Sequence, residues 1–316
     1  MADDQHVIVV DNLVKRFGAL TAVDGISFHV RKGEVFGILG PNGAGKTTAL
    51  ECIEGLQKPT SGSLRVMGLD VLRETDAVKE RIGVQLQASA YFDYLTLREI
   101  LRLFGSFYAR SVPPGVLLEK VGLTEKESTT VGKLSGGQKQ RFAIAATLVN
   151  DPDVIFLDEP TTGLDPQARH NLWDFIQQVH GDGQTVVLTT HYMEEAQTLC
   201  DRVAIMDRGS IVAMDAPQTL IRSLPAPYEI TVAAEGDVNS AALGGLDGVV
   251  GVDLGRNGEV SLRSREAAQT LPALLKWGVD AGVVFSRLEV QPANLEDVFL
   301  SLTGRGLTGN AEGDGR

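Results

Sequence analysis

The stretch Gly40-Pro-Asn-Gly-Ala-Gly-Lys-Thr-Thr48 decides the fold. It has the form G-x-x-x-x-G-K-[ST] of a phosphate-binding loop, whose glycines let the backbone bend tightly and point its N–H groups at phosphate oxygens. Lys46 is placed to reach the β and γ phosphates of a nucleotide, and the hydroxyl of Thr47 can ligate Mg²⁺. An apolar, strand-like run at 35–39 precedes the loop and a helix-like run at 46–56 follows it. The phosphates are therefore expected at a helix N-terminus in an α/β domain.

A second stretch, Leu134-Ser-Gly-Gly-Gln-Lys-Gln-Arg141, resembles the signature sequence of the ABC-family ATPases. The family's other elements can then be found in the family's order. They are an adenine-stacking aromatic at Phe17, a Q-loop glutamine at Gln87, the Walker B acids Asp158 and Glu159, the D-loop Asp165 and the switch histidine His191. Phe17 replaces the more frequent tyrosine and keeps the π face that stacking needs. Gln85 is an alternative Q-loop glutamine, and Gln87 is favoured because it directly follows a strand-like segment.

The resemblance covers residues 7–224 and implies a P-loop NTPase fold with a RecA-like core, an antiparallel β patch and a helical subdomain. It implies ATP hydrolysis with ATP and Mg²⁺ as cofactors. In this role Glu159 orients or deprotonates the attacking water, His191 contacts the γ-phosphate, and Gln87 senses the metal and the water. The metal would be held by Thr47, Gln87 and Asp158. The nucleotide-binding set comprises Phe17, Gly40, Pro41, Asn42, Gly43, Ala44, Gly45, Lys46, Thr47, Thr48, Ser135, Gly136, Gly137, Gln138 and Asp165.

The signature residues imply a second copy of the chain. Ser135, Gly136 and Gly137 are expected to open a helix, where N–H groups and the helix dipole suit a phosphate. The family uses them against the γ-phosphate bound by the opposite subunit. Because this chain has one phosphate loop and one signature, we expect a head-to-tail homodimer that encloses two ATP molecules. The family also places a membrane subunit near the segment 88–94, whose three aromatic residues, Tyr91, Phe92 and Tyr94, suit an interface. Local packing within the helical subdomain is the alternative for them.

Composition changes at Ser223-Leu-Pro-Ala-Pro227, which predicts a stiff linker. Alternating and hairpin patterns beyond it predict a small α+β accessory domain at 225–304, followed by a disordered Gly-rich tail at 305–316. The segment 292–304 is similar to the C-terminal segment of exporter ATPases of the ABC-2, daunorubicin-resistance type. Its stripe of Leu295, Val298, Phe299 and Leu302 is also what any docking helix would show.

Net charge, cysteine spacing and the pattern of apolar residues restrict the classes of function that remain. The net charge of −12 argues against a general nucleic-acid binder, and the two cysteines show no metal-like spacing. No signal peptide and no apolar stretch of roughly 18–20 residues is found, so a transporter's membrane path would belong to another chain. We therefore expect the peripheral ATPase of an exporter, from a drug, antibiotic, lipid or polysaccharide class, at the cytoplasmic face of the membrane. An importer ATPase and a soluble ABC ATPase without transport function are the alternatives.

Overall fold

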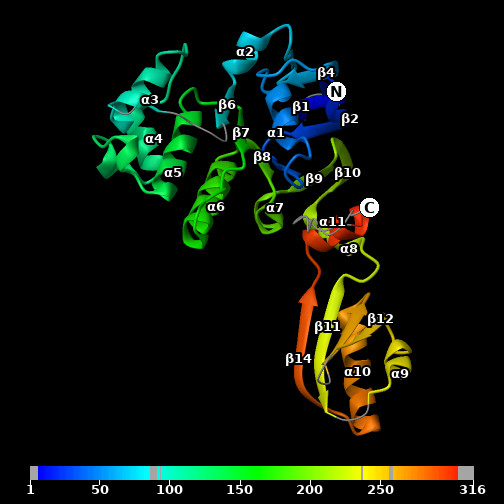
Figure 1. Cartoon of the computed structure of the whole chain (residues 1–316). Coiled ribbons are helices and arrows are strands. Elements are labelled where there is room, and N and C mark those ends of the chain that lie inside the picture. The colour runs from blue at the N-terminus through cyan, green and yellow to red at the C-terminus, as the bar shows by residue number, and fades with distance from the viewer. Residues whose placement is uncertain (1–5, 86–90, 93, 236–237, 256–258, 305–316) are drawn as a thin grey trace, which may run out of the picture. The chain divides into compact units, whose positions relative to one another are not determined.

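The computed structural model describes residues 6–85, 91–92, 94–235, 238–255 and 259–304. Contacts between residues divide the chain into two compact units, Met1–Ala216 and Pro217–Arg316. The break precedes the helix α8 (Pro217–Arg222), rather than falling in the proline-containing stretch after it. Each unit has its own sheets and helices (Figure 1). No helix among the described residues combines the length and apolarity that a membrane span requires.

A six-stranded, mostly parallel sheet forms the centre of the first unit. Its strand order is β10 (Ser210–Asp215), β9 (Arg202–Asp207), β3 (Val35–Leu39), β8 (Thr185–Thr190), β7 (Val154–Asp158) and β6 (Ile82–Gln85), and only β10 runs antiparallel to its neighbour. All residues of β3, β7 and β8 are buried, as expected for strands covered on both faces. These three strands are adjacent and parallel. The segments that follow them, at residues 40, 159 and 191, therefore meet at one edge of the sheet.

A second, antiparallel sheet has the order β2 (Leu20–Arg31), β1 (His6–Phe17), β4 (Ser61–Val66) and β5 (Leu69–Asp70). The strands β1 and β2 are the longest of this sheet, with 12 residues each. Several register shifts let this long pair bend. Gly18, with a φ of 58°, allows the tight turn, and Phe17 pairs with Leu20 at its base. The turn thus holds Phe17 at the end of the hairpin.

Seven α-helices complete the described part of the first unit. The helices α1 (Lys46–Ile53), α2 (Thr75–Lys79), α6 (Pro166–Gly181) and α7 (Met193–Leu199) connect or cover the strands, and α3 (Leu97–Gly105), α4 (Pro114–Lys120) and α5 (Gly136–Thr147) pack against one another as a helical subdomain. Short 3₁₀ turns at Thr124–Lys126 and Val131–Lys133 lead into α5. The helical subdomain expected from the resemblance is thus present.

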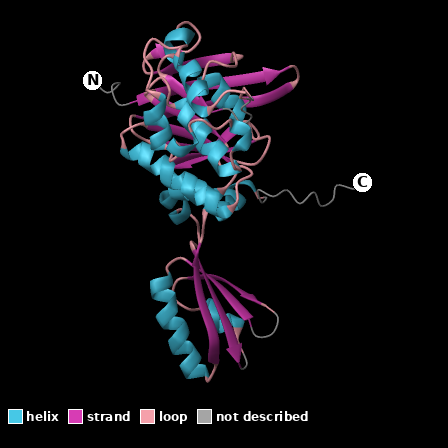
Figure 2. Ribbon diagram, turned by 90° about the vertical axis from the view of Figure 1, so that its left-hand side faces the viewer, coloured by secondary structure: helices cyan, strands magenta, loops and turns pink. Residues whose placement is uncertain are grey.

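The second unit contains a four-stranded antiparallel sheet with α10 against one face (Figure 2). Its elements after α8 are β11 (Tyr228–Glu235), α9 (Ser240–Gly244), β12 (Val249–Leu254), β13 (Glu259–Ser264), α10 (Ala267–Ala281), β14 (Val284–Pro292) and α11 (Leu295–Thr303). Ile230, Val232, Leu262 and Leu274 are central to its core. The predicted hairpin is confirmed by the pairing of β12 with β13, although its turn lies outside the described residues.

The last helix, α11, packs against α8. Leu295, Val298 and Phe299 are buried as the apolar stripe predicts, but Leu302 is 49% exposed. Asn294 caps the helix in a reciprocal capping box with Asp297. The Gly-rich tail at 305–316 lies outside the described residues.

Candidate nucleotide-binding and hydrolysis site

The phosphate loop leaves no room for side chains at two of its glycines. A Cβ on Gly40 would lie 2.2 Å from the carbonyl oxygen of Met206. A Cβ on Gly45 would lie 2.2 Å from the carbonyl oxygen of Ala22, and the φ of Gly45 is +100°. Both positions therefore require glycine. They seat the loop against the neighbouring backbone, so that its N–H groups can face a ligand at the start of α1.

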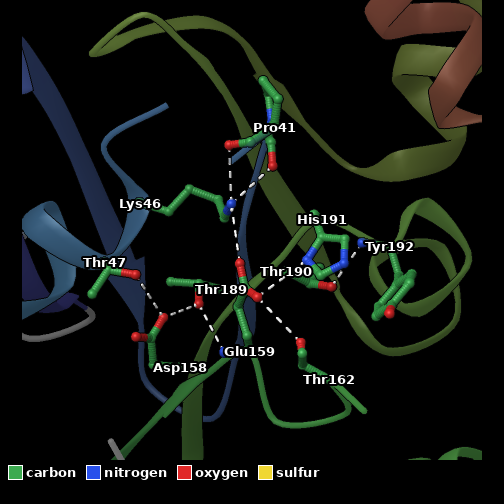
Figure 3. Close-up of polar contacts among 11 residues, drawn as sticks. Pro41, Lys46, Thr47, Asp158, Glu159, Thr162, Thr189, Thr190, His191 and Tyr192 are labelled. Carbon is green, nitrogen blue, oxygen red and sulfur yellow. Dashed lines mark hydrogen bonds and ion pairs between the residues drawn. The ribbon is translucent and has the colours of Figure 1, made fainter. Parts of the chain in front are cut away.

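Lys46 is folded over the loop that precedes it. Its Nζ donates hydrogen bonds to the carbonyl oxygens of Gly40 and Pro41, at 2.9 and 3.2 Å, and lies 3.3 Å from Oε1 of Glu159 (Figure 3). These three partners match the three donors of an ammonium group. The side chain of Lys46 is only 4% exposed and that of Glu159 is 8% exposed. Phosphate oxygens that bind Lys46 would therefore replace partners that the lysine already has.

Glu159 joins Lys46 to the switch histidine. Its Oε2 lies 3.2 Å from Nδ1 of His191 and accepts a hydrogen bond from the hydroxyl of Thr162 at 3.1 Å. Burial by itself would raise the pKa of Glu159. The charges of Lys46 and His191, together with hydrogen bonds from Lys46 and Thr162, outweigh burial and lower that pKa. Glu159 is thus held as a carboxylate, the form that can accept a proton from water.

The backbone of Glu159 is in the left-handed region, with a φ of 47°, which a residue with a Cβ rarely adopts. Its N–H donates to both the carbonyl oxygen and the hydroxyl of Thr189, at 3.2 and 2.9 Å. The same Thr189 hydroxyl donates to Oδ1 of Asp158. Thr189 therefore fixes the turn at which the two acids diverge, a role that the sequence alone did not indicate.

Thr47 and Asp158, two of the predicted metal ligands, lie at the same edge of the sheet as Glu159. The Thr47 hydroxyl donates to Oδ1 of Asp158 at 3.1 Å, and Asp158 is 4% exposed. A hydroxyl and a carboxylate so close together fit a hard cation such as Mg²⁺, which takes one or two protein oxygens and completes its shell with water and phosphate. The two predicted metal ligands that the structure describes are thus brought together on one side of Glu159.

An open pocket of about 560 Å³ lies over the loop. Its lining includes Phe17, Lys46, Thr47 and Glu159, and it also includes Arg208, which the sequence analysis missed. Phe17 is 46% exposed, with Nζ of Lys15 lying 4.6 Å from its ring centroid. Most of the loop residues predicted to bind nucleotide line this pocket: Asn42, Gly43, Gly45, Lys46, Thr47 and Thr48. One ring face of Phe17 is occupied by Lys15, which leaves the other for a flat base.

The signature residues lie elsewhere. Ser135 caps α5 in a reciprocal capping box with Gln138, whose side chain accepts from the Ser135 N–H at 3.0 Å. Gly137 is packed close to Ala168 of α6, since a Cβ there would lie 3.1 Å from the Ala168 Cβ. Among the described residues that line the pocket, none belongs to 135–138. The helix start expected from the sequence is therefore present, but it is not assembled with this chain's own phosphate loop.

The other residues predicted from the sequence are Asp165, the Q-loop glutamine and the aromatic residues of the segment 88–94. Asp165 caps α6, accepting a hydrogen bond from the N–H of Ala168 at 2.8 Å. Gln87 lies outside the described residues, whereas the alternative glutamine, Gln85, is the buried last residue of β6. Tyr91 packs against Phe104 and Phe142, so local packing, the alternative considered for the aromatic segment, holds for this residue. Phe92 and Tyr94 are 53% and 88% exposed.

Comparison with known proteins agrees with this geometry. The family model described as "ABC transporter" matches residues 23–162. The chain is 41% identical to the Nod factor export ATP-binding protein I of Paraburkholderia xenovorans, over 95% of this chain and 98% of that protein. It is 36% identical to the linearmycin resistance ATP-binding protein LnrL of Bacillus subtilis, over 95% and 99% of the two chains.

Solved structures of similar proteins cover about two thirds of this chain. CbiO1 of Clostridium perfringens, part of the ABC transporter complex cbiONQ, matches with a TM-score of 0.63 and 27% identity, over 69% of this chain and 92% of that one. The dimeric ATP-binding cassette MJ0796, determined after hydrolysis with ADP and Pi, matches with a TM-score of 0.60 and 27% identity, over 66% and 98%. The predicted fold is thereby confirmed, and the chain belongs to the ABC transporter family as one of its ATP-binding, ATP-hydrolysing proteins.

Proposed function

We propose that this chain is the ATPase subunit of an exporter whose membrane path lies in a separate permease. The observation that carries this proposal is the cluster of Lys46, Glu159 and His191 at the edge of the sheet, beside Thr47 and Asp158. Two relatives similar over nearly their whole length are named for Nod factor export and for linearmycin resistance. The proposed cargo accordingly belongs to the drug, antibiotic, lipid or polysaccharide class.

In the proposed reaction each residue acts on a defined atom. Lys46 releases Glu159 and binds the β and γ phosphates, while the loop N–H groups hold the remaining phosphate oxygens. Glu159 then orients or deprotonates the water that attacks the γ-phosphate, and His191 keeps that carboxylate in position while it contacts the same phosphate. Gln87 is proposed to join the metal and the water. Mg²⁺, held by Thr47 and Asp158, supplies charge neutralisation for the phosphates when it is bound.

The proposed working form is a homodimer in which each signature faces the partner's phosphate loop. A two-fold axis places the loop of each copy against the signature of the other, so both sites are completed together. Ser135, Gly136 and Gly137 then offer a helix N-terminus to the γ-phosphate. ATP stabilises the closed pair because the closed state binds it better than the open state, and hydrolysis removes that preference.

The exposed aromatics Phe92 and Tyr94 are the proposed contacts with the permease, at the cytoplasmic face of the membrane. A direct test uses the full chain as bait for proteins extracted from native membranes, with Phe92→Ser/Tyr94→Ser as the variant. Phe107→Ser is the matched control, because Phe107 is also an exposed aromatic, at 69%, in the helical subdomain. We expect a polytopic membrane protein with the wild type and the control, and its loss with the double variant. Recovery of ribosomal or DNA-repair proteins, with no membrane protein, would contradict the exporter proposal.

A further inference from the structure

Beyond the residues at the phosphate edge, a buried acid connects three segments of the site. Glu195, on α7, is fully buried, and its Oε1 accepts a hydrogen bond from the indole N–H of Trp173, on α6, at 3.2 Å. The hydroxyls of Thr161 and Thr190 also lie beside this carboxyl group and favour its charged form. Thr161 follows Glu159 by two residues, and Thr190 directly precedes His191. Glu195 thus touches α6 and both segments that carry the predicted catalytic pair.

The buried polar atoms around Glu195 do not all have hydrogen-bond partners. Within the described part of the chain, neither Oε2 of Glu195 nor the Thr161 hydroxyl makes a hydrogen bond of standard geometry. Burial raises the pKa of Glu195, although Thr190, Thr161, Trp173 and the charge of Arg169 all oppose that rise. A buried polar group of this kind is costly to retain, because its desolvation is not fully offset. Such a cost is more easily explained by a role in the site than by stability alone.

A second contact runs from the same helix to the histidine. The guanidinium of Arg169, on α6, lies 4.3 Å from the ring centroid of Tyr192, whose ring centroid is 4.1 Å from that of His191. Asp165, the cap of α6, precedes Arg169 by four residues, and Trp173 follows it by four. Residues four apart lie on one face of a helix. One face of α6 therefore leads from the D-loop to His191 through Tyr192 and through Glu195.

We propose that Glu195 and Arg169 are positioning residues that hold His191 against Glu159 and link both to the D-loop at the start of α6. A displacement of Asp165 moves the rigid helix that carries Arg169 and Trp173, and so reaches the switch segment. Binding of a partner chain against the D-loop therefore moves α6, and this movement changes the 3.2 Å contact between His191 and Glu159. This step rests on the proposed homodimer, whereas the positioning role of Glu195 does not.

The kinetic test compares Glu195→Ala with Glu195→Gln in the full chain, with Glu194→Ala as control. Glu194 is an adjacent acid on the same helix, but it is exposed. We expect Glu195→Ala to lower kcat by about tenfold or more, with the affinity for ATP changed by less than about twofold. Glu195→Gln should keep most of the wild-type kcat, because its amide oxygen can accept from Trp173. Melting temperatures give the folded fraction for which each kcat is corrected.

An ATP-free measurement tests the contact itself. The chain has two tryptophans, so the change Trp277→Phe leaves Trp173 as the single tryptophan reporter. In that background Glu195→Ala should shift the emission of Trp173 and Glu194→Ala should not. The proposal is overturned if the emission is unchanged, if the corrected kcat of Glu195→Ala equals that of the control, or if Gln loses as much activity as Ala. Loss of the permease interaction would affect none of these measurements, so failure of the exporter proposal would be seen separately.

Discussion

The phosphate loop and the signature helix are both proposed to bind phosphate, yet only the loop is surrounded by the proposed catalytic groups. At the loop, Lys46, Glu159 and His191 form one connected cluster, and Lys46 and Glu159 line a pocket. At the signature, Ser135 and Gln138 are hydrogen-bonded to each other, and neither belongs to the described lining of the pocket. The difference indicates that one chain supplies two incomplete halves. A second copy is the simplest source of what each half lacks.

The largest expected effect comes from removing the negative charge of Glu159. Glu159→Gln should lower the rate of ATP hydrolysis by at least about 100-fold, since general acid–base groups contribute 10²- to 10⁴-fold. ATP binding should persist or become tighter, because Lys46 loses an ionic partner that competes with phosphate. Single-turnover hydrolysis and equilibrium binding of a fluorescent ATP analogue would measure the two effects. A normal rate of hydrolysis would remove Glu159 from its proposed role.

Changing the signature should separate hydrolysis from binding. Ser135→Arg is expected to block hydrolysis and to leave the affinity of the monomer for ATP unchanged, because the described pocket lining contains no residue of 135–138. Thr96→Arg is the matched control, since Thr96 caps α3 in the same type of capping box, with Glu99. Both variants lose a cap, a cost of about 1 kcal/mol. Equal rates of hydrolysis in the two variants would remove the distinction between the halves.

A smaller effect is expected at the end of the β1–β2 hairpin. Phe17→Ala should weaken ATP binding by about two- to tenfold, the range expected for loss of one aromatic stacking contact. Phe17→Tyr should retain the wild-type affinity because the ring remains. Titration with ATP and with a ribose triphosphate that lacks the base would show whether the loss depends on adenine. Equal losses for both ligands would exclude stacking on the base.

A separate effect, on stability, is expected at Glu54, the residue that ends α1. Burial raises the pKa of Glu54 to about 8, assisted by the charges of Asp158 and Glu51. The folded chain therefore holds a proton that the unfolded chain releases above its ordinary pKa, so stability falls as pH rises from about 4.5 to 8. Glu54→Gln should abolish this part of the decline and raise the melting temperature at pH 8. An identical pH dependence in wild type and Glu54→Gln would contradict the assignment.

The sequence was sufficient for the elements whose chemistry depends on a local motif. The loop 40–48, the capped helix start at Ser135 and the two acids at the end of β7 all lie where their spacing predicted, because each motif is a short segment with one favourable backbone path. The strands that carry them were equally clear, since buried parallel strands are continuous apolar runs.

Contacts that depend on several distant segments could not be predicted. The left-handed φ of Glu159 is supported by Thr189, and the position of Arg208 beside the pocket depends on β9 lying next to β3. The lengths of β1 and β2 could not be predicted because register shifts interrupt the alternation that marks a strand. The Glu195 contacts join α6, α7, the loop after β7 and the end of β8, and no local pattern distinguishes Glu195 from the exposed Glu194 beside it.

The most direct test of the composite ATP site mixes two variants, each of which is expected to be inactive alone. Lys46→Ala lacks a working phosphate loop and keeps its signature, whereas Ser135→Arg keeps its loop and lacks its signature. In a mixed two-fold pair, the loop of the second chain meets the signature of the first, so one intact site forms. The account predicts that each variant alone is inactive and that ATP hydrolysis returns on mixing. If mixed pairs form, as shown by pull-down of differently tagged chains, and hydrolysis does not return, the composite site is contradicted.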